Sequence, residues 1–377
     1  MFLPGGETIV QTDLLFLEMI ISIILILTFA IALVVMTLIS MWNLILVIYS
    51  GFARRGIGTW DDRDSWRDAV KAKARKWLCR APAVLWADRG LFGIVKGRLS
   101  SRKPNTWQTA GLLMGLDDED VQDIADSRRD LFSGQVLSKD NGLLAFSLKE
   151  RGLLKAEDEK RLLSGMDRYL ESGTIPFSSE RQDSRQVETI GLICPFLYST
   201  GLGELADRQI DEYDKALFNN VFPYHGFDIT TGLPLGAHDW GRGTGLYILG
   251  LVESGHYEGK ILGLAENMLR LQRTDGAFGC FLFDKHSSRD SFTTVFAGLL
   301  FVSAYRLSGG DRFLDAARAV EKALMSMTRK NGTVDYAQAD SKGIGFYPAS
   351  FEPMPFVQGM TVRFSKELDK AGASARS

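Results

Sequence analysis

Residues 19 to 53 contain no charged side chain, and this run limits the fold of the chain more than any other feature. From Met19 to Ser50 it reads MIISIILILTFAIALVVMTLISMWNLILVIYS, without Gly or Pro. Since about 20 apolar residues suffice to cross a bilayer, the run predicts one tilted or projecting transmembrane helix. No basic segment precedes it and no small-residue cleavage site follows it, which disfavours a cleaved signal peptide.

The charges that flank this run differ on its two sides. Glu7, Asp13 and Glu18 precede it without any Lys or Arg, whereas nine cations follow it by residue 80. Because Lys and Arg stay on the cytoplasmic side, the sequence predicts a single-pass protein of the cell inner membrane with a cytoplasmic C-terminal domain. The predicted parts are a short N-terminal segment (1–18), a transmembrane helix (19–51), a basic juxtamembrane helical linker (52–100) and the main domain (101–377).

Within the linker, a helix is predicted from Asp61 to Cys79. Apolar side chains recur among its cations, at Trp66, Ala69, Val70, Ala74 and Trp77. Such a helix is either solvated or lies on anionic lipid headgroups, and the sequence leaves both interpretations open.

Charge and composition exclude several classes of protein. The net charge of the 377 residues is −2, so no basic field indicates nucleic acid as a partner. The three cysteines are widely separated, which does not fit a disulfide framework. The four histidines form no HExxH pattern, so we predict no metal site and no cofactor.

Beyond about residue 100 the chain is a series of helical segments separated by short breaks that contain Gly, Asp or Pro. Helices are predicted at 117–131, 142–151, 156–171, 186–198, 204–218, 243–253, 259–272, 291–307 and 312–327. Alternating patterns typical of strands are scarce. Helix pairs joined by turns predict an all-α fold, either an α-solenoid or an (α/α) toroid, and periodicity alone does not separate the two.

Six collinear segments carry a family resemblance. They read VETIGLICPFL (187–197), HDWGRGTGLYILG (238–250), LQRTDGAFG (271–279), SFTTVFAGLLFVSAYRL (291–307), KNGTVDY (330–336) and SKGIGFYP (341–348). Together they resemble the unsaturated glucuronyl and rhamnogalacturonyl hydrolases of glycoside hydrolase families 88 and 105. WGRGTG is the most specific of the matches. The resemblance implies an (α/α)6 barrel, here preceded by one transmembrane helix.

The reaction that this resemblance implies is hydration of the C4–C5 double bond of a terminal unsaturated uronic acid. A carboxylic acid protonates C4, water adds at C5, and the resulting hemiketal opens to release the neighbouring sugar. Glu188 stands where the family has its acid, an Asp, and Asp140 matches the second acidic residue. The alternatives are that Glu188 pairs with Arg185 or Arg181, and that Asp140 only caps a helix.

Substrate-binding residues are predicted in and near the HDWGRG segment. Trp240 suits stacking on a sugar face, and Arg242 suits a bidentate grip on a uronate carboxylate. His238 and Asp239 precede them on the same turn, and His225 is a further candidate. The alternative is a purely structural turn around a buried Trp240.

Three hypotheses for function follow. The first is a membrane-tethered glycoside hydrolase that acts on oligo- or polysaccharides with unsaturated uronic acids, with polysaccharide synthesis machinery as a partner. The second is a non-catalytic carbohydrate-binding or scaffold protein, favoured by the replacement of the family's Asp with Glu188, because the added methylene changes the reach by roughly 1.5 Å. The third is an epimerase or lyase that depends on His225 and His238.

Overall fold

The computed structural model describes residues 6–79, 106–117, 121, 136–166, 169, 173–177, 182–217, 222–341 and 343–374. Within these residues there are twelve helices and five short strands. The helices are α1 (Gly6–Ala53), α2 (Arg63–Cys79), α4 (Thr106–Gly115), α6 (Gly142–Lys149), α7 (Ala156–Leu163), α9 (Glu188–Ser199), α10 (Gly203–Leu217), α11 (Gly241–Ser254), α12 (Glu258–Leu271), α13 (Ser291–Ser308), α14 (Asp311–Ser326) and α15 (Pro355–Ser374). The strands are β1 (Ser184–Gln186), β2 (Gly226–Asp228), β3 (Pro234–Leu235), β4 (Ala337–Gln338) and β5 (Phe351–Glu352). The predicted helix at 117–131 lies almost entirely outside the described residues.

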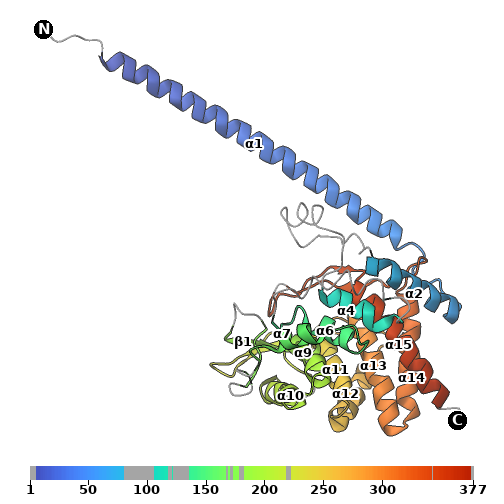
Figure 1. Ribbon diagram of the computed structural model, residues 1–377. Coiled ribbons are helices and arrows are strands. Elements are labelled where there is room, and N and C mark those ends of the chain that lie inside the picture. The colour runs from blue at the N-terminus through green and yellow to red at the C-terminus, as the bar shows by residue number, and fades with distance from the viewer. Residues whose placement is uncertain are drawn as a thin grey trace. The chain divides into compact units, whose positions relative to one another are not determined.

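Six helices close a ring. In order, α4, α6, α9, α11, α13 and α15 each pack against the next, and α15 returns to α4. Helices α2, α10, α12 and α14 pack on the outside of this ring (Figure 1). A solenoid would leave its first and last helices apart, so the closure confirms the (α/α)6 toroid and the all-α class. The sequence had not predicted α4 and α15, which form one of the contacts in the ring.

The inner and outer helices differ in sequence for a physical reason. Helices α9 and α11 bury almost every side chain, because the inner layer has neighbours on all sides. Outer helices such as α12 and α14 bury a stripe and expose charges. Helix α13 is long and apolar enough to cross a membrane, but most of it is buried in the ring.

Glycines allow the inner helices to approach closely. A Cβ on Gly115 of α4 would lie 2.0 Å from the carbonyl oxygen of Gly359 in α15. Similarly, a Cβ on Gly191 of α9 would lie 2.2 Å from the carbonyl oxygen of Leu246 in α11. Neither contact has room for a side chain, so the backbones themselves form these helix interfaces.

Helix α2 belongs to the toroidal domain. Trp66 is fully buried, and its indole Nε1 donates to Thr328 Oγ1 at 2.9 Å. The carbonyl of Val70 accepts a bond of 3.0 Å from Gln358 of α15. The sequence left open whether this helix is solvated or lies on lipid headgroups. In the structure its apolar stripe packs against α4 and α15. The compact unit that contains the toroid also includes residues from Gly56 onward.

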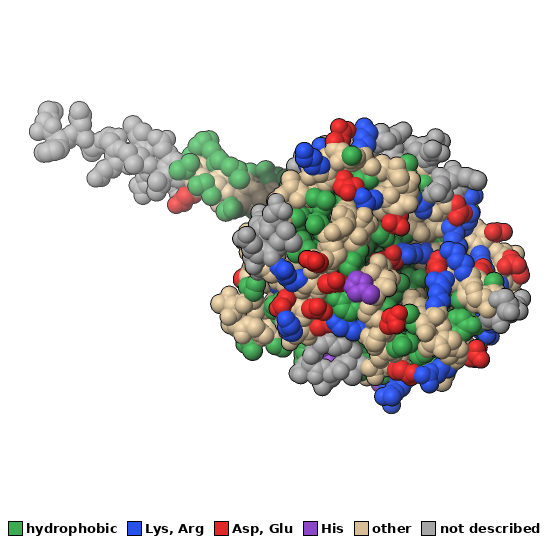
Figure 2. Space-filling model, turned by 60° about the horizontal axis from the view of Figure 1, so that its bottom comes forward, with side chains coloured by type: hydrophobic (Ala, Val, Ile, Leu, Met, Phe, Trp, Pro, Cys, Tyr) green, Lys and Arg blue, Asp and Glu red, His purple; other side chains and the backbone are tan. Residues whose placement is uncertain are grey.

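Helix α1 is a separate unit. It has 48 residues and is therefore roughly 72 Å long at about 1.5 Å per residue. Its stretch from Phe16 to Trp42 has a mean hydropathy of 3.1 and none of it is buried. Figure 2 shows hydrophobic side chains on the part of this helix whose side chains are described. Length and composition suffice for this stretch to cross a membrane.

The strands form two small sheets. Strands β1, β2 and β3 are antiparallel neighbours, with Arg185 opposite Phe227. Strands β4 and β5 pair as a hairpin, with Gln338 opposite Phe351. Residues 337 to 352 are called the β4–β5 hairpin below.

Candidate active site

A cavity of about 330 Å³ opens where the inner helices begin. Its lining residues come from the first two turns of α4, α9, α11 and α13, the residues just before α6, the segment before β1, and the β4–β5 hairpin. They include three carboxylates, two cations and four aromatic rings, namely Asp140, Glu188, Asp340, Lys139, Arg242, Trp107, Phe177, Trp240 and Phe292. Helix N-termini carry partial positive charge, so several inner helices direct a field that favours anions toward this cavity.

Glu188 is the first residue of α9 and is 6% exposed. Its Oε1 lies 3.0 Å from Nε2 of His225, whose side chain is fully buried. The other oxygen, Oε2, is buried and has no hydrogen-bond partner among the described residues. Arg185 bonds instead to Thr174 Oγ1 at 2.6 Å, so it is not the partner of Glu188. Arg181 lies outside the described residues.

Tyr347 extends this pair into a chain of three side chains. Its hydroxyl lies 3.1 Å from Nδ1 of His225 and accepts a 2.8 Å bond from the backbone N–H of Ala237. Burial raises the pKa of Tyr347, so the phenol keeps its proton and can donate to His225. Both ring nitrogens of His225 are thus engaged.

The hydrogen-bonded series of Glu188, His225 and Tyr347 is compatible with two protonation states of Glu188. When Tyr347 donates to Nδ1, the imidazole carries its proton on Nε2 and donates to an ionised Glu188. When Glu188 carries a proton, it donates to Nε2, and the proton on Nδ1 is donated to the Tyr347 oxygen. In both states His225 keeps both of its hydrogen bonds, so the contacts fit either protonation state of Glu188.

Trp240 forms one wall of the cavity and is 2% exposed. Its ring centroid lies 4.3 Å from that of His225 and 5.0 Å from that of Tyr347. Its Nε1 donates to Gln338 Oε1 at 2.9 Å. Trp240 therefore packs against His225 and Tyr347 as well as lining the cavity.

Arg242 lines the same cavity but is already paired. Its Nη1 lies 2.6 Å from Oδ1 of Asp340, and its Nη2 donates to the carbonyl oxygen of Gln338. Its Nε is buried without a partner among the described residues. The guanidinium lies over the ring of Phe292, with 5.1 Å from Cζ to the centroid. The guanidinium of Arg242 is thus paired with a carboxylate from the β4–β5 hairpin.

Asp140 lies at the mouth of the cavity. Its side chain is 64% exposed and pairs with Lys139 at 2.7 Å. The N-cap residue of α6 is Asn141, which makes no capping bond with its side chain, and Asp140 does not cap the helix. The structure therefore brings Asp140 to the same cavity as Glu188, and the helix-cap interpretation is wrong.

His238 and Asp239 lie apart from the lining of the cavity. The His238 ring packs 5.2 Å from that of Tyr224 and 5.3 Å from that of Phe283. Asp239 accepts backbone N–H bonds from Leu282 and Phe283. These contacts give both residues a role in holding the loop before α11.

Sequence reasoning missed Tyr347, Gln338 and Asp340. All three lie on the β4–β5 hairpin, and the SKGIGFYP segment that marked this hairpin includes Tyr347. No local pattern ties Asp340 to Arg242, which lies 98 positions earlier.

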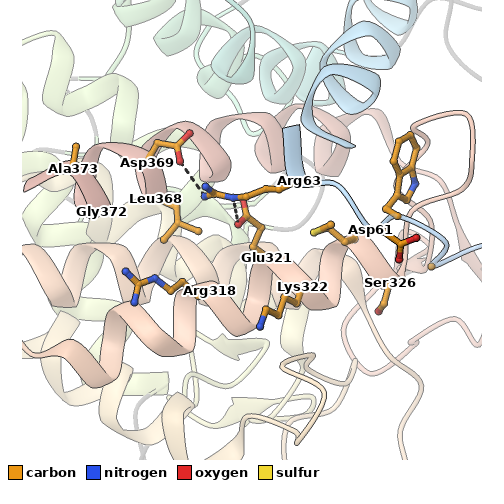
Figure 3. Close-up of a pocket in the computed structure, with 13 residues that line it drawn as sticks. Asp61, Arg63, Arg318, Glu321, Lys322, Ser326, Leu368, Asp369, Gly372 and Ala373 are labelled. Atoms are coloured by element: carbon orange, nitrogen blue, oxygen red, sulfur yellow. Dashed lines mark hydrogen bonds and ion pairs between the residues drawn. The ribbon is translucent and has the colours of Figure 1, made fainter. Parts of the chain in front are cut away.

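A larger cavity of about 810 Å³ lies between α14, α15 and the segment before α2. Two of its carboxylates are engaged, since Arg63 reaches Glu321 at 2.6 Å and Asp369 at 3.0 Å (Figure 3). It shares no lining residue with the cavity at Glu188. None of the predicted site residues lies in it.

Comparison with solved structures identifies the fold. A possible member of the GH105 family from Klebsiella pneumoniae is similar with a TM-score of 0.65 at 16% identity, covering 82% of this chain and 94% of that one. An unsaturated glucuronyl hydrolase from Bacillus sp. GL1, described as responsible for the degradation of glycosaminoglycan, gives 0.59 at 18% identity, covering 79% and 94%. A polysaccharide lyase gives 0.53 at 13% identity, covering 81% and 98%.

No protein-family model matches the sequence, and comparison with curated protein sequences gives no match. The structural similarity confirms, at the level of the fold, the resemblance to the unsaturated uronyl hydrolases. At these identities it establishes the shared toroid, and the chemistry depends on the residues of the cavity.

Proposed function

We propose that this protein is a glycoside hydrolase that acts on oligo- or polysaccharides containing unsaturated uronic acids. The observation that carries the proposal is the buried pair of Glu188 and His225, of which Glu188 lines a cavity at the N-terminal ends of the inner helices. The solved structures that share the toroid include an unsaturated glucuronyl hydrolase. A uronate carboxylate fits the field of these helix ends.

In this proposal Glu188 is the general acid and base. Protonated Glu188 gives its proton to C4 of the unsaturated sugar, and the carboxylate then takes a proton from the water that adds at C5. His225 fixes the position of the Glu188 carboxyl through the 3.0 Å bond to Oε1, which leaves Oε2 for the substrate. Asp140, at the mouth, holds a sugar hydroxyl.

Trp240 and Arg242 complete the proposed site. The ring of Trp240 provides an apolar wall for a sugar face, and Arg242 provides the positive charge for the uronate. His225 acts through Glu188. His238 and Asp239 act on the substrate only through the loop that they hold.

Loss of ultraviolet absorbance tests the proposal, because hydration removes the conjugated double bond. The protein is mixed with lyase-generated unsaturated oligosaccharides of several uronic acids. Absorbance is followed at ~235 nm, where the enoate absorbs, because general-acid hydration removes this chromophore. A fall with at least one uronide is expected. No fall with any of them would refute the hydrolase.

The second candidate is a non-catalytic carbohydrate-binding protein. The observation in its favour is that Arg242 is occupied by Asp340, so the charge that would orient a uronate is already neutralised. Such a protein would bind saccharides without changing their absorbance, and replacing Glu188 with Gln would leave its behaviour unchanged.

We further propose that α1 tethers the domain to the cell inner membrane as a single span, with residues 19–51 in the bilayer and the toroid in the cytoplasm beside polysaccharide synthesis machinery. The charge difference across the span supports this orientation. A reporter that is active only in the periplasm, fused after Ser377, should stay silent. An active reporter, or recovery of the protein without α1, would contradict the tether or its orientation.

A further inference from the structure

Two residues that line this cavity each have a buried polar atom without a partner among the described residues. The atoms are Oε2 of Glu188, an acceptor, and Nε of Arg242, a donor. Leaving such atoms unsatisfied costs folding free energy, so their presence beside one cavity indicates a place for a polar ligand. Nη1 and Nη2 of Arg242 each donate to the β4–β5 hairpin, and Nη2 also lies 3.9 Å from Sδ of Met354.

The two contacts of Arg242 with the hairpin differ in kind. The carbonyl oxygen of Gln338 is held by the backbone pairing of β4 with β5. Asp340 contributes only a side chain, which is 40% exposed, to a guanidinium that is 5% exposed. The Asp340 carboxylate can therefore turn into solvent, whereas the buried guanidinium has to keep a partner.

The hairpin itself is fixed on both sides of Asp340. On one side the Gln338 side chain accepts from Trp240 at 2.9 Å and donates to the carbonyl of Pro348 at 2.9 Å. On the other, Tyr347 is bonded to His225 and to the N–H of Ala237. Release of Arg242 thus requires rotation of one side chain and no opening of the hairpin.

We propose that the Asp340 carboxylate competes with the carboxylate of the substrate for Arg242, and that this competition sets the affinity of the site for uronates. This inference rests on the proposed function. In the empty site Asp340 neutralises Arg242. A uronate replaces it by an exchange of one carboxylate for another, so the buried guanidinium is never left unpaired.

Such an exchange lowers the affinity for the uronate, because its ion pair with Arg242 forms only when the ion pair between Asp340 and Arg242 breaks. A neutral sugar carries no charge that could replace Asp340 on Arg242, so it leaves this ion pair in place and its affinity does not depend on Asp340. Removing the Asp340 charge should therefore strengthen binding of an anionic sugar selectively, on the order of fivefold, the range measured for partly exposed ion pairs.

The experiment measures binding by calorimetry to the full chain in detergent. Glu188→Gln serves as the background, so that the ligand is not consumed, and Asp340→Asn is added to it. The probes are an unsaturated glucuronyl disaccharide and its neutral methyl ester. A matched control is Asp275→Asn, which removes another partly exposed carboxylate, paired with Arg289 at 2.6 Å and outside the cavity.

The expected result is tighter binding of the acid in the Asp340→Asn protein, with the affinity for the methyl ester unchanged and Asp275→Asn without effect on either. Equal affinities for the acid with and without Asp340 would overturn the inference, as would a parallel change for acid and ester. If the native chain still turns over the disaccharide, only the role of Asp340 fails. If it neither binds nor converts the acid, the proposed function fails as well.

Discussion

The carboxyl group of Glu188 and the imidazole of His225 are joined by a 3.0 Å hydrogen bond between two buried side chains. Glu188 begins an inner helix, and His225 comes from the segment before β2, so the bond connects the ring to the small sheet. Tyr347 holds the opposite nitrogen of the imidazole from the β4–β5 hairpin. Three separate parts of the chain therefore determine the position of one carboxyl group.

Replacing Tyr347 with Phe tests whether this chain of contacts carries protons. The variant loses the hydroxyl that bonds Nδ1 of His225, and the N–H of Ala237 loses its acceptor. We expect kcat to fall about tenfold, the value of one buried hydrogen bond, with little change in KM. We also expect the pH profile of kcat to move, because the proton on His225 is redistributed.

Tyr305→Phe on α13 is the matched control for this change and should leave the profile as it was. A Tyr347→Phe protein with a native pH profile and kcat would show that Tyr347 only fills space.

The contact of α4 with α15 depends on Gly115. In Gly115→Ala the new Cβ would lie 2.0 Å from the Gly359 carbonyl oxygen, so the ring has to expand. Overpacking of this kind costs about 1–3 kcal/mol, and the free energy of unfolding in urea should fall by that amount. Gly263→Ala on α12 meets no atom within 4 Å and should instead stabilise the protein slightly. Equal effects of the two changes would contradict the close approach of α4 and α15.

Helix α2 should be indispensable to the toroid. Trp66 is fully buried, so Trp66→Ala should lower the free energy of unfolding by about 3–5 kcal/mol, whereas Lys76→Ala on the exposed face should not. A chain that begins at Gly56 should unfold cooperatively in urea. One that begins at residue 101 should not fold, and a cooperative transition for that shorter chain would show that α2 is only a linker.

Asp117 connects α2 and α15 through Lys71 and Lys366, with 2.5 Å to Lys366. The hydrogen bonds from Lys366 and Lys71 lower the pKa of Asp117 from 3.8 to about 2. Because the folded pKa is the lower one, the stabilisation is complete above about pH 4 and is lost as the pH falls through about 2.

Asp117→Asn should therefore be less stable than the native chain at pH 7, and the two unfolding curves should converge between about pH 4 and pH 2. Asp315→Asn, which removes an exposed pair with Arg318, controls for the loss of a surface carboxylate. A difference between Asp117→Asn and the native chain that stays constant down to pH 2 would contradict this linkage.

The sequence predicted the inner helices wherever long apolar segments made the pattern clear. The starts of α9, α11 and α13 lie within two residues of those expected. Helix α4 is short and contains two glycines, and α15 combines charges with Pro355 and Gly359, so neither shows a clear stripe. Their glycines serve a contact that is visible only in three dimensions.

Those residues of the candidate site that belong to a recognisable sequence segment could be predicted. Glu188, Asp140, Trp240 and Arg242 do line one cavity. Their partners were not predictable, because each bond joins distant positions, such as Arg242 to Asp340 and Glu188 to His225. The position of α2 escaped prediction because its stripe of tryptophans among cations also fits a helix on a lipid surface.

The central claim is that Glu188 transfers the proton. The measurement that tests it most directly compares the native chain with Glu188→Gln on an unsaturated glucuronyl disaccharide, following turnover by absorbance and affinity by calorimetry. The glutamine keeps the shape and can still bond to His225, but it has no acidic proton to give. We predict that kcat falls by about 10²–10⁴-fold while the dissociation constant stays within a few-fold. Undiminished turnover in Glu188→Gln would contradict the account.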